Sequence, residues 1–285
     1  MADASVADTV PDPRSLARTY DLRGRDDPWD AVKEYQRVMR AAADHPDKKS
    51  HALSKVVDLP RSRIRAWVED GGMPGPVRAI QTAETRGLLV RNLDTTAGAA
   101  FAGLVAWVFS GGSIRTDYYD PYFALNGTRP EQSQTDLQTL AAVFDLDLRV
   151  NDREDGRATE LVPTEDSSIL GRCLATTGAP VGNKTDTPLQ IPPWIEGGPT
   201  RVQRAFAYVY ITNRGAYGGE AGVLQIQESS RPKGFHRDLA ALLETVAAAG
   251  TVTASADHVR ADRPATEALT ALRETELKTV LGGEG

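Results

Sequence analysis

Arginine side chains dominate the part of the sequence best suited to binding phosphates and base edges. Between residues 48 and 91, nine basic residues stand against four acidic ones, so this segment carries a net charge of +5 in a chain whose total is −6. Arg61, Ser62, Arg63 and Arg65 fall within five consecutive residues. An arginine can form two hydrogen bonds with guanine or with a phosphate, and a serine hydroxyl can bond to either. The run predicts contact with nucleic acid.

Cysteine and histidine are rare in the sequence. Cys173 is the only cysteine, which excludes an internal disulfide and every cysteine-rich zinc or iron–sulfur site. The four histidines are scattered along the chain, which argues against a histidine cage: His45, His51, His236 and His258. We therefore expect neither a metal ion nor another cofactor.

The composition indicates a cytoplasmic protein of two modules. A length of 285 residues suits two domains, and no apolar run approaches the roughly 20 residues of a membrane span. Residues 1–13 are acidic, unlike a secretory signal, so we expect a soluble protein that lies with the nucleoid and binds no membrane. Seven of the 33 basic residues are lysine and the rest are arginine, a bias that resembles the proteins of salt-loving archaea.

Hydrophobic spacing predicts a helical domain over residues 28–92, preceded by a flexible acidic tail over residues 1–27. One apolar stripe predicts a first helix that ends near His45: Trp29, Val32, Tyr35, Val38 and Met39. Further helices are predicted over residues 49–57, 61–69 and 77–89, because prolines and glycines interrupt the pattern between them.

Residues 53–67 resemble the helix-turn-helix of DNA-binding proteins. Leu59 and Ile64 match the apolar pair that locks the two helices, and Asp58 stands where the family usually has a glycine. The resemblance implies that Arg61, Ser62, Arg63 and Arg65 lie on the helix that enters the major groove. The alternative is an amphipathic helix with a solvated basic face.

Two apolar segments in the larger half of the chain resemble each other. Residues 104–112 and 207–215 close on glycines that lie 103 residues apart, and each predicts a central helix buried on several sides. Small residues at Ala102, Ala106 and Ser110 predict close packing between the two helices. After each segment the pattern predicts two strands, a helix, two strands and a closing helix, the last of these over residues 265–281.

This order is similar to that of the two-repeat LAGLIDADG proteins, the homing-endonuclease family. Residues 170–185 and 192–195 look like the segment between the repeats of archaeal members, and the chain also resembles the bacterial WhiA regulators, which join the same two domain types in the opposite order. The resemblance implies an α+β protein, with an all-α helix-turn-helix domain followed by two αββαββα repeats whose antiparallel sheets form a saddle on DNA. The LAGLIDADG-like domain is expected over residues 95–283, with repeats at about 95–180 and 198–283.

Two positions of the family motif lack the expected acids. Family nucleases carry an acidic residue before each closing glycine to hold a divalent metal ion, and those positions here are Gly111 and Arg214. We therefore expect no catalytic residues, no bound metal and no enzymatic activity. Asp117, Asp120 and Glu220 are the alternatives for a displaced metal site. Arg214 is expected to contact a DNA phosphate, or else to pair with an acid of its own chain such as Glu220.

The expected function is sequence-specific binding of double-stranded DNA, as a transcriptional regulator. Besides the helix-turn-helix residues, the expected DNA contacts on the saddle are arginines: Arg115, Arg149, Arg153, Arg157, Arg214 and Arg260. Arg172 and Lys184, between the repeats, are expected to be structural. A homodimer through the helix-turn-helix half stays open. The alternatives are an endonuclease with displaced acids, an RNA-binding maturase-like protein, and a module for protein or small-ligand contacts.

Overall fold

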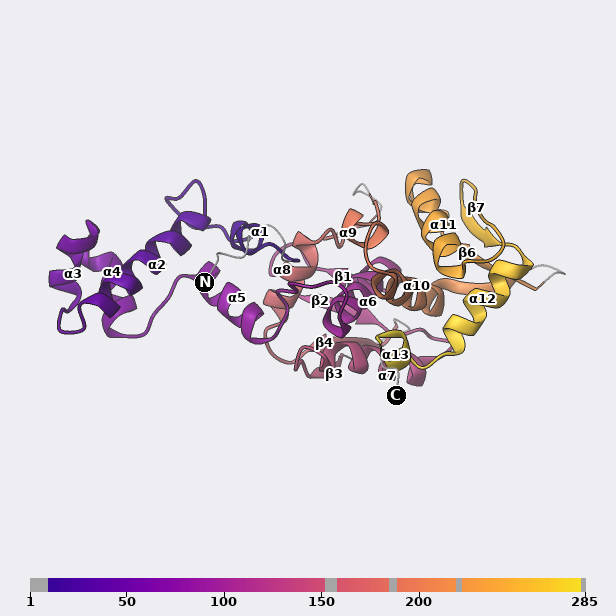
Figure 1. The fold of residues 1–285 in the computed structure, drawn as a ribbon, viewed down its shortest axis with the longest axis horizontal. Coiled ribbons are helices and arrows are strands. Elements are labelled where there is room, and N and C mark those ends of the chain that lie inside the picture. The colour runs from indigo at the N-terminus through magenta and orange to yellow at the C-terminus, as the bar shows by residue number, and fades with distance from the viewer. Residues whose placement is uncertain (1–9, 152–157, 185–188, 219–221, 283–285) are drawn as a thin grey trace.

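The computed structural model describes residues 10–151, 158–184, 189–218 and 222–282. They form thirteen helices and two four-stranded antiparallel sheets. Figure 1 shows an elongated molecule, with helices α2 to α4 at one end of the long axis and both sheets in the body beyond them. Among the described residues, no helix combines the length and the apolar character needed to cross a membrane.

Helices α2 (Trp29–Asp44), α3 (Ser50–Val57) and α4 (Arg61–Glu69) form a small unit at that end. All three confirm the helices predicted from the sequence. The turn between α3 and α4 contains Asp58 in the left-handed conformation, with φ of 51°, and Pro60 precedes the first residue of α4. Four residues are buried in the core of this unit: Val38, Leu53, Val57 and Ile64.

Residues 10–27 do not form the predicted flexible tail. Helix α1 (Pro13–Arg18) begins at Asp12, whose carboxylate accepts hydrogen bonds from the Arg14 and Ser15 amides, and it buries Leu16 and Ala17. Val10 forms a β-bridge with Val90. Proline at the first helical position and aspartate at the N-cap are a strong helix start, and the short apolar face completes the core of the body.

Helix α5 (Gly75–Thr85) connects the N-terminal helices with the body of the molecule. It packs on α1, on α2 and on α8 (Ser167–Thr176), and its Ala79 and Ala83 belong to the main core. Arg86, just after α5, forms ion pairs with Asp145 at 3.1 Å and Asp166 at 3.0 Å. The predicted boundary near residue 92 therefore does not separate two independent cores.

The body contains the predicted repeat. The first unit consists of α6 (Thr96–Ser110), β1 (Gly112–Ile114), β2 (Pro121–Ala124), α7 (Pro130–Ala142), β3 (Leu148–Asn151), β4 (Glu160–Pro163) and α8. After α9 (Pro193–Glu196), the second consists of α10 (Thr200–Arg214), β5 (Gly215–Gly218), β6 (Val223–Gln227), α11 (Lys233–Ala247), β7 (Val252–Ala254), β8 (His258–Ala261) and α12 (Arg263–Glu274). The predicted αββαββα order is confirmed in both units.

The two sheets have matching topologies. Their strand orders are β1-β2-β4-β3 and β5-β6-β8-β7, and every neighbouring pair is antiparallel. The pair Phe123 and Leu161 in the first sheet, like Ile226 and Val259 in the second, is buried. Because side chains alternate between the faces of a strand, one face of each sheet is packed and the other is left to polar residues.

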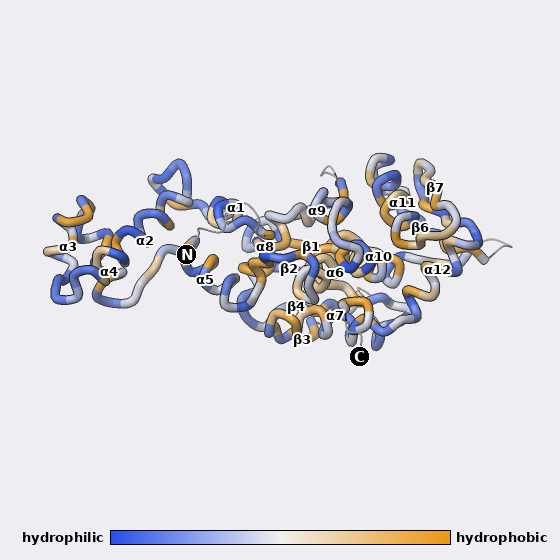
Figure 2. The backbone as a smooth tube through the Cα atoms, viewed as in Figure 1, coloured by the Kyte–Doolittle hydropathy of each residue, from blue (hydrophilic) through white to orange (hydrophobic). Residues whose placement is uncertain are grey.

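Helices α6 and α10 pack against each other at the centre of the body (Figure 1), and Figure 2 shows hydrophobic chain gathered there. Ala102, Ala106 and Ser110 are buried, as the predicted packing of two central helices requires. Gly103 lies so close to α7 that an added Cβ would stand 2.7 Å from a methyl carbon of Leu140. Small side chains thus permit the close approach of α6 to its neighbours.

The prediction of a single helix over residues 265–281 is wrong. Helix α12 ends at Glu274, Thr275 is extended with ψ of 141°, and a short helix α13 (Leu277–Val280) follows. The break turns Leu277, Val280 and Leu281 into the main core, where α13 contacts α7 and α10. Burial of three apolar side chains outweighs the hydrogen bonds lost at the break.

Candidate nucleic-acid interface

Helix α4 exposes all four residues predicted to contact DNA: Arg61, Ser62, Arg63 and Arg65. Ser62 is exposed, and the side chains of Arg63 and Arg65 are 46% and 61% exposed. Arg63 lies 3.5 Å from Glu34 and Arg65 lies 3.4 Å from Glu69. Ion pairs on an exposed surface contribute about 0–1 kcal/mol, so both guanidinium groups can exchange these partners for a phosphate or a base.

Arg61 has a different environment from its neighbours. Its Nε donates a hydrogen bond to Ser50 Oγ over 3.2 Å, and the Ser50 hydroxyl donates to Glu69 Oε1 over 2.6 Å. These Ser50 hydrogen bonds lower the pKa of Glu69. The guanidinium therefore ties the start of α4 to the start of α3.

The open face of the first sheet carries Arg149. Phe123 pairs with Leu161 on the packed face, so the register places Arg149, Asn151 and Tyr122 on the opposite face. Arg115 follows β1 and forms a hydrogen bond with Tyr122, and its other neighbour is Asp117 at 3.9 Å. Arg153 and Arg157 lie outside the described residues.

The open face of the second sheet carries a denser polar row. Gln225 pairs with Arg260, and Arg260 pairs with Thr253 across the next strand. Gln227 and His258 form the adjacent pair on the same face. Glutamine and arginine are the side chains that form two hydrogen bonds with adenine and guanine in the major groove. Arg260 was predicted from the sequence, whereas the two glutamines were missed because only the strand register shows which way they face.

The last turn of α6 is surrounded by cationic side chains. Arg214, the last residue of α10, donates from Nε to the Ser110 carbonyl oxygen. The Phe109 carbonyl oxygen accepts from Lys184 Nζ over 3.4 Å and from Arg231 Nη2 over 3.2 Å. The final carbonyls of a helix carry partial negative charge and have no partner within the helix, which explains why cations bind here.

A single buried acid, Glu228, lies behind these cations. Its side chain is 5% exposed, with Arg214 Nε at 3.3 Å and Arg231 Nε at 3.8 Å, and it accepts a hydrogen bond from the Tyr210 hydroxyl. Burial, reinforced by the Glu228 charge, raises the pKa of Tyr210. Burial, with the charges of Arg231 and Arg214, lowers the pKa of Lys184 to about 7. Arg214 thus pairs with an acid of its own chain, and that acid is Glu228. Glu220, the partner named from the sequence, lies outside the described residues.

A cavity of about 350 Å³ opens at the same place, and Lys184, Arg214, Asn126 and Asn213 are among its lining residues. The Asn126 amide donates to the Thr212 carbonyl over 2.8 Å, and the Asn213 amide donates to Ser110 Oγ over 2.9 Å. The Asn213 side-chain oxygen is buried and has no hydrogen-bond partner in the described part of the chain. We name this the helix-end cavity.

The residues at the family's metal-binding positions do not fit a divalent cation. Gly111 and Arg214 supply no carboxylate, and Arg214 brings a positive charge. Within the described ranges, no group of three histidine, cysteine or acidic side chains could hold a metal ion. Asp117 is exposed beside Arg115 rather than part of such a group.

Arg172 is structural, as predicted. Its guanidinium lies between the rings of Tyr20 and Tyr119, 4.0 and 4.3 Å from their centroids. This stacking holds residue 20 against the first repeat, because cation–π contacts gain strength when they are shielded from water. Lys184, in contrast, joins the helix-end cavity.

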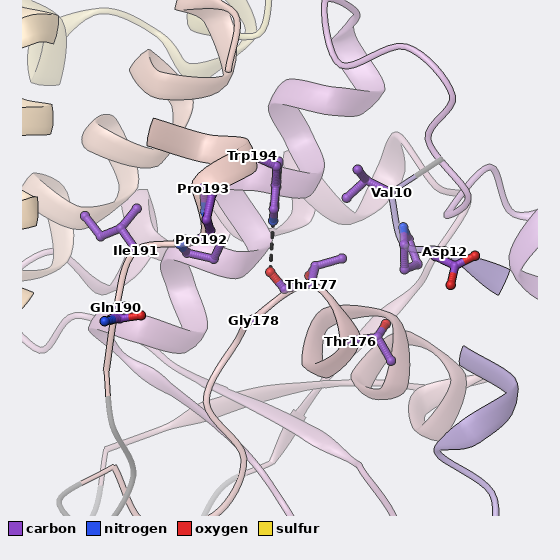
Figure 3. A pocket seen from close by; sticks show the side chains of 11 residues that line it. Val10, Asp12, Thr176, Thr177, Gly178, Gln190, Ile191, Pro192, Pro193 and Trp194 are labelled. Carbon is purple, nitrogen blue, oxygen red and sulfur yellow. Dashed lines mark hydrogen bonds between the residues drawn. The ribbon is translucent and has the colours of Figure 1, made fainter. Parts of the chain in front are cut away.

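A second cavity, of about 450 Å³, lies between residues 10–12, the end of α8 and the segment that leads into α9 (Figure 3). Trp194 donates from its indole nitrogen to the Thr177 carbonyl over 2.9 Å. Asp12 is the charged residue of its lining, and its carboxylate already caps α1. This cavity therefore offers a ligand little charge to bind.

Solved structures are similar to this chain, whereas sequence comparisons find no match. No family model and no curated protein matches the sequence. A crystal structure of I-DmoI in complex with DNA and Mn is similar with a TM-score of 0.42 and 12% identity, over 63% of this chain and 98% of that one. A structure of mesophilic variants of the homing endonuclease I-DmoI is similar with a TM-score of 0.40 and 11% identity, over 64% of this chain and 99% of that one.

The same comparison corrects one expectation. From Gly111 and Arg214 we expected a protein that is not an enzyme, but the similar structures are homing endonucleases, which are enzymes. The replacement of two acids shows that one donor set is missing and does not show that the chain is inactive.

Proposed function

We propose that this protein binds double-stranded DNA in a sequence-specific manner and regulates transcription. The observation that carries the proposal is the paired arrangement of the sheets, each of which presents an arginine on its polar face: Arg149 on the first and Arg260 on the second. β-Strands can enter the major groove, where arginine and glutamine distinguish guanine and adenine from other bases. Arg260 with Gln225 forms the better reading pair, because the two side chains lie on adjacent strands.

Helix α4 supplies a second DNA contact in this proposal. A helix of nine residues follows α3 after a three-residue turn, and it presents Ser62, Arg63 and Arg65 outward, as the second helix of a helix-turn-helix does. Arg61 then acts mainly by holding α4 against α3. The combination of such a pair with a LAGLIDADG-like body, as in the WhiA regulators that it resembles, supports a regulator.

The remaining arginines contact phosphates in this proposal. Arg115, after β1, and Arg214, at the end of α10, add positive charge beside the first sheet and at the helix ends. Arg153 and Arg157, which lie outside the described residues, are proposed as further phosphate contacts. Phosphate contacts fix the position of a protein on DNA and make binding depend on salt, whereas contacts with base edges give specificity.

The proposal is tested by selecting preferred duplexes with the full chain and measuring affinity against salt concentration. Arg260→Gln should weaken binding to the preferred duplex by about 1–3 kcal/mol and relax selectivity at one base pair. The matched control is Arg237→Gln, because Arg237 is exposed on α11, which covers the opposite side of the second sheet. Equal losses from both variants would contradict base reading by the sheet.

Regulation is tested on the same selected duplex. The bound protein is incubated with Mg²⁺ or Mn²⁺, and transcription from a promoter that contains the site is measured in parallel. An intact duplex with altered transcription supports a regulator, whereas metal-dependent cutting at the bound site makes the protein an endonuclease. The stoichiometry of the titration tests dimerisation through the α3–α4 half.

A further inference from the structure

The helix-end cavity holds more positive charge than the protein itself neutralises. Glu228 is the nearest acid, and its one carboxylate contacts both Arg214 at 3.3 Å and Arg231 at 3.8 Å. With Lys184, three cations of the described chain therefore face one acid, and two of the three, Lys184 and Arg214, line the cavity. Charges of one sign that are held close together repel each other unless a counter-charge is present, so the excess of cations favours an anion in the cavity.

Both side chains keep hydrogen-bond donors for such an anion. Lys184 donates to the Phe109 carbonyl, and an ammonium group has three hydrogens. Arg214 uses its Nε towards Ser110, and a guanidinium group has five N–H donors. The α6 carbonyls, which would repel an anion, are covered by these same cations.

We propose that the helix-end cavity binds one backbone phosphate of duplex DNA through Lys184 and Arg214, without a metal ion. The inference rests on the proposed function. The phosphate is favoured over a carboxylate or a chloride because two cations of different geometry converge on one cavity: the guanidinium can bind two oxygens and the ammonium a third. Lys184 comes from the segment between the repeats, so this segment becomes part of the binding surface.

The first test uses inorganic phosphate and the melting temperature of the full chain. Phosphate should raise the melting temperature of the wild type, because a ligand that binds only the folded state stabilises it. Lys184→Met should weaken phosphate binding about tenfold or more, while its melting temperature without phosphate stays equal or rises, since a buried charge is removed. Lys233→Met is the matched control, because Lys233 is exposed close to Arg231 but does not line the cavity. A phosphate response that survives in Lys184→Met overturns the proposal.

The second test measures duplex binding in EDTA. Lys184→Met and Arg214→Gln should each bind the preferred duplex about tenfold more weakly, with a salt slope reduced by about one. Lys184→Arg keeps the charge and should lose less affinity than Lys184→Met. If Lys184→Met binds the duplex as tightly as the wild type does, the phosphate contact is overturned but the proposed function is not. Phosphate binding without any effect of these variants on duplex affinity shows a site for free phosphate and also overturns the assignment.

Discussion

The C-terminal ends of α6 and α10 occupy related places in the two repeats, but different side chains donate hydrogen bonds to their last carbonyls. The last carbonyls of α6 accept hydrogen bonds from three cationic residues, Lys184, Arg214 and Arg231. The last-turn carbonyls of α10 accept from the neutral amide of Asn126 and from the Gly215 backbone N–H, and a cation, Arg273, donates over 3.3 Å to the carbonyl of Gly215, just after the helix. The two repeats therefore share one backbone arrangement, although among the described residues positive charge is concentrated at the end of α6.

The difference arises because the cations reach α6 from other parts of the chain. Arg231 precedes α11 in the second repeat, Lys184 lies between the repeats, and Arg214 ends α10. Nothing in the first repeat supplies the same residues to α10 among the contacts of the described chain. The charge at the end of α6 therefore depends on the second repeat and on the segment between the repeats, rather than on α6 itself.

The largest expected effect comes from Glu228→Gln. The substitution leaves Arg214 and Arg231 next to Lys184 without their buried counter-charge, so the free energy of unfolding should fall by about 3–5 kcal/mol in urea denaturation. Glu267→Gln, at a 70% exposed side chain paired with Arg263, is the control and should cost less than about 1 kcal/mol. Equal losses would show that the cations at the α6 end need no internal acid.

The glycines that follow the two helices should differ in their tolerance of alanine. A Cβ on Gly112 would stand 2.8 Å from the Tyr122 carbonyl oxygen, and one on Gly215 would stand 2.5 Å from that of Ile211. Each substitution should therefore cost about 1–3 kcal/mol of unfolding free energy. At Gly111 the nearest atom would be 3.4 Å away, so Gly111→Ala should change stability by less than about 1 kcal/mol. A large loss at Gly111 would contradict the open geometry of the α6 end.

The pH dependence of duplex binding should reveal Lys184. Its pKa of about 7 in the free protein rises when a phosphate binds, so binding takes up a proton and affinity should fall by up to about tenfold per pH unit above pH 7. Lys184→Arg should flatten this profile. The groups around Lys184 are Arg214, Arg231 and Glu228, with Tyr210 on the far side of Glu228.

The same pKa has the opposite effect on the stability of the free protein. The folded pKa lies below the ordinary value of 10.5, so between about pH 7 and pH 10 the unfolded chain binds more protons. The contribution of Lys184 to stability therefore rises with pH while duplex affinity falls. Parallel trends of affinity and stability would contradict the assignment to Lys184.

The smallest change in stability is expected from a substitution at the C-terminal end of α10. Asn126→Ala removes the amide that binds the Thr212 carbonyl and should lower the unfolding free energy by about 1 kcal/mol, with an unchanged salt slope of duplex binding. Asn92→Ala is a matched control, because Asn92 also supports a turn but touches neither helix end. A changed salt slope in Asn126→Ala would show that the α10 end, too, takes part in electrostatic binding.

Local patterns in the sequence predicted most helices and strands. The apolar stripes, the prolines and the doubled segment ending at Gly112 and Gly215 report on neighbours within a few residues, and these neighbours decide where a helix or strand forms. The αββαββα order and the pairing of α6 with α10 follow from such signals. Asp58 was also recognised as a turn residue, because its conformation depends mainly on its own backbone.

Tertiary contacts decided the rest. Packing ordered residues 10–27 and divided the helix predicted over residues 265–281, because apolar side chains there gain burial only against distant elements. The strand register places Gln225 opposite Arg260 on one face of the second sheet. Lys184 meets Phe109 across 75 residues of sequence, and Glu228 meets Arg214 only when β6 returns beside α10. Charge and burial at the helix-end cavity depend on distances in space, which spacing along the chain does not determine.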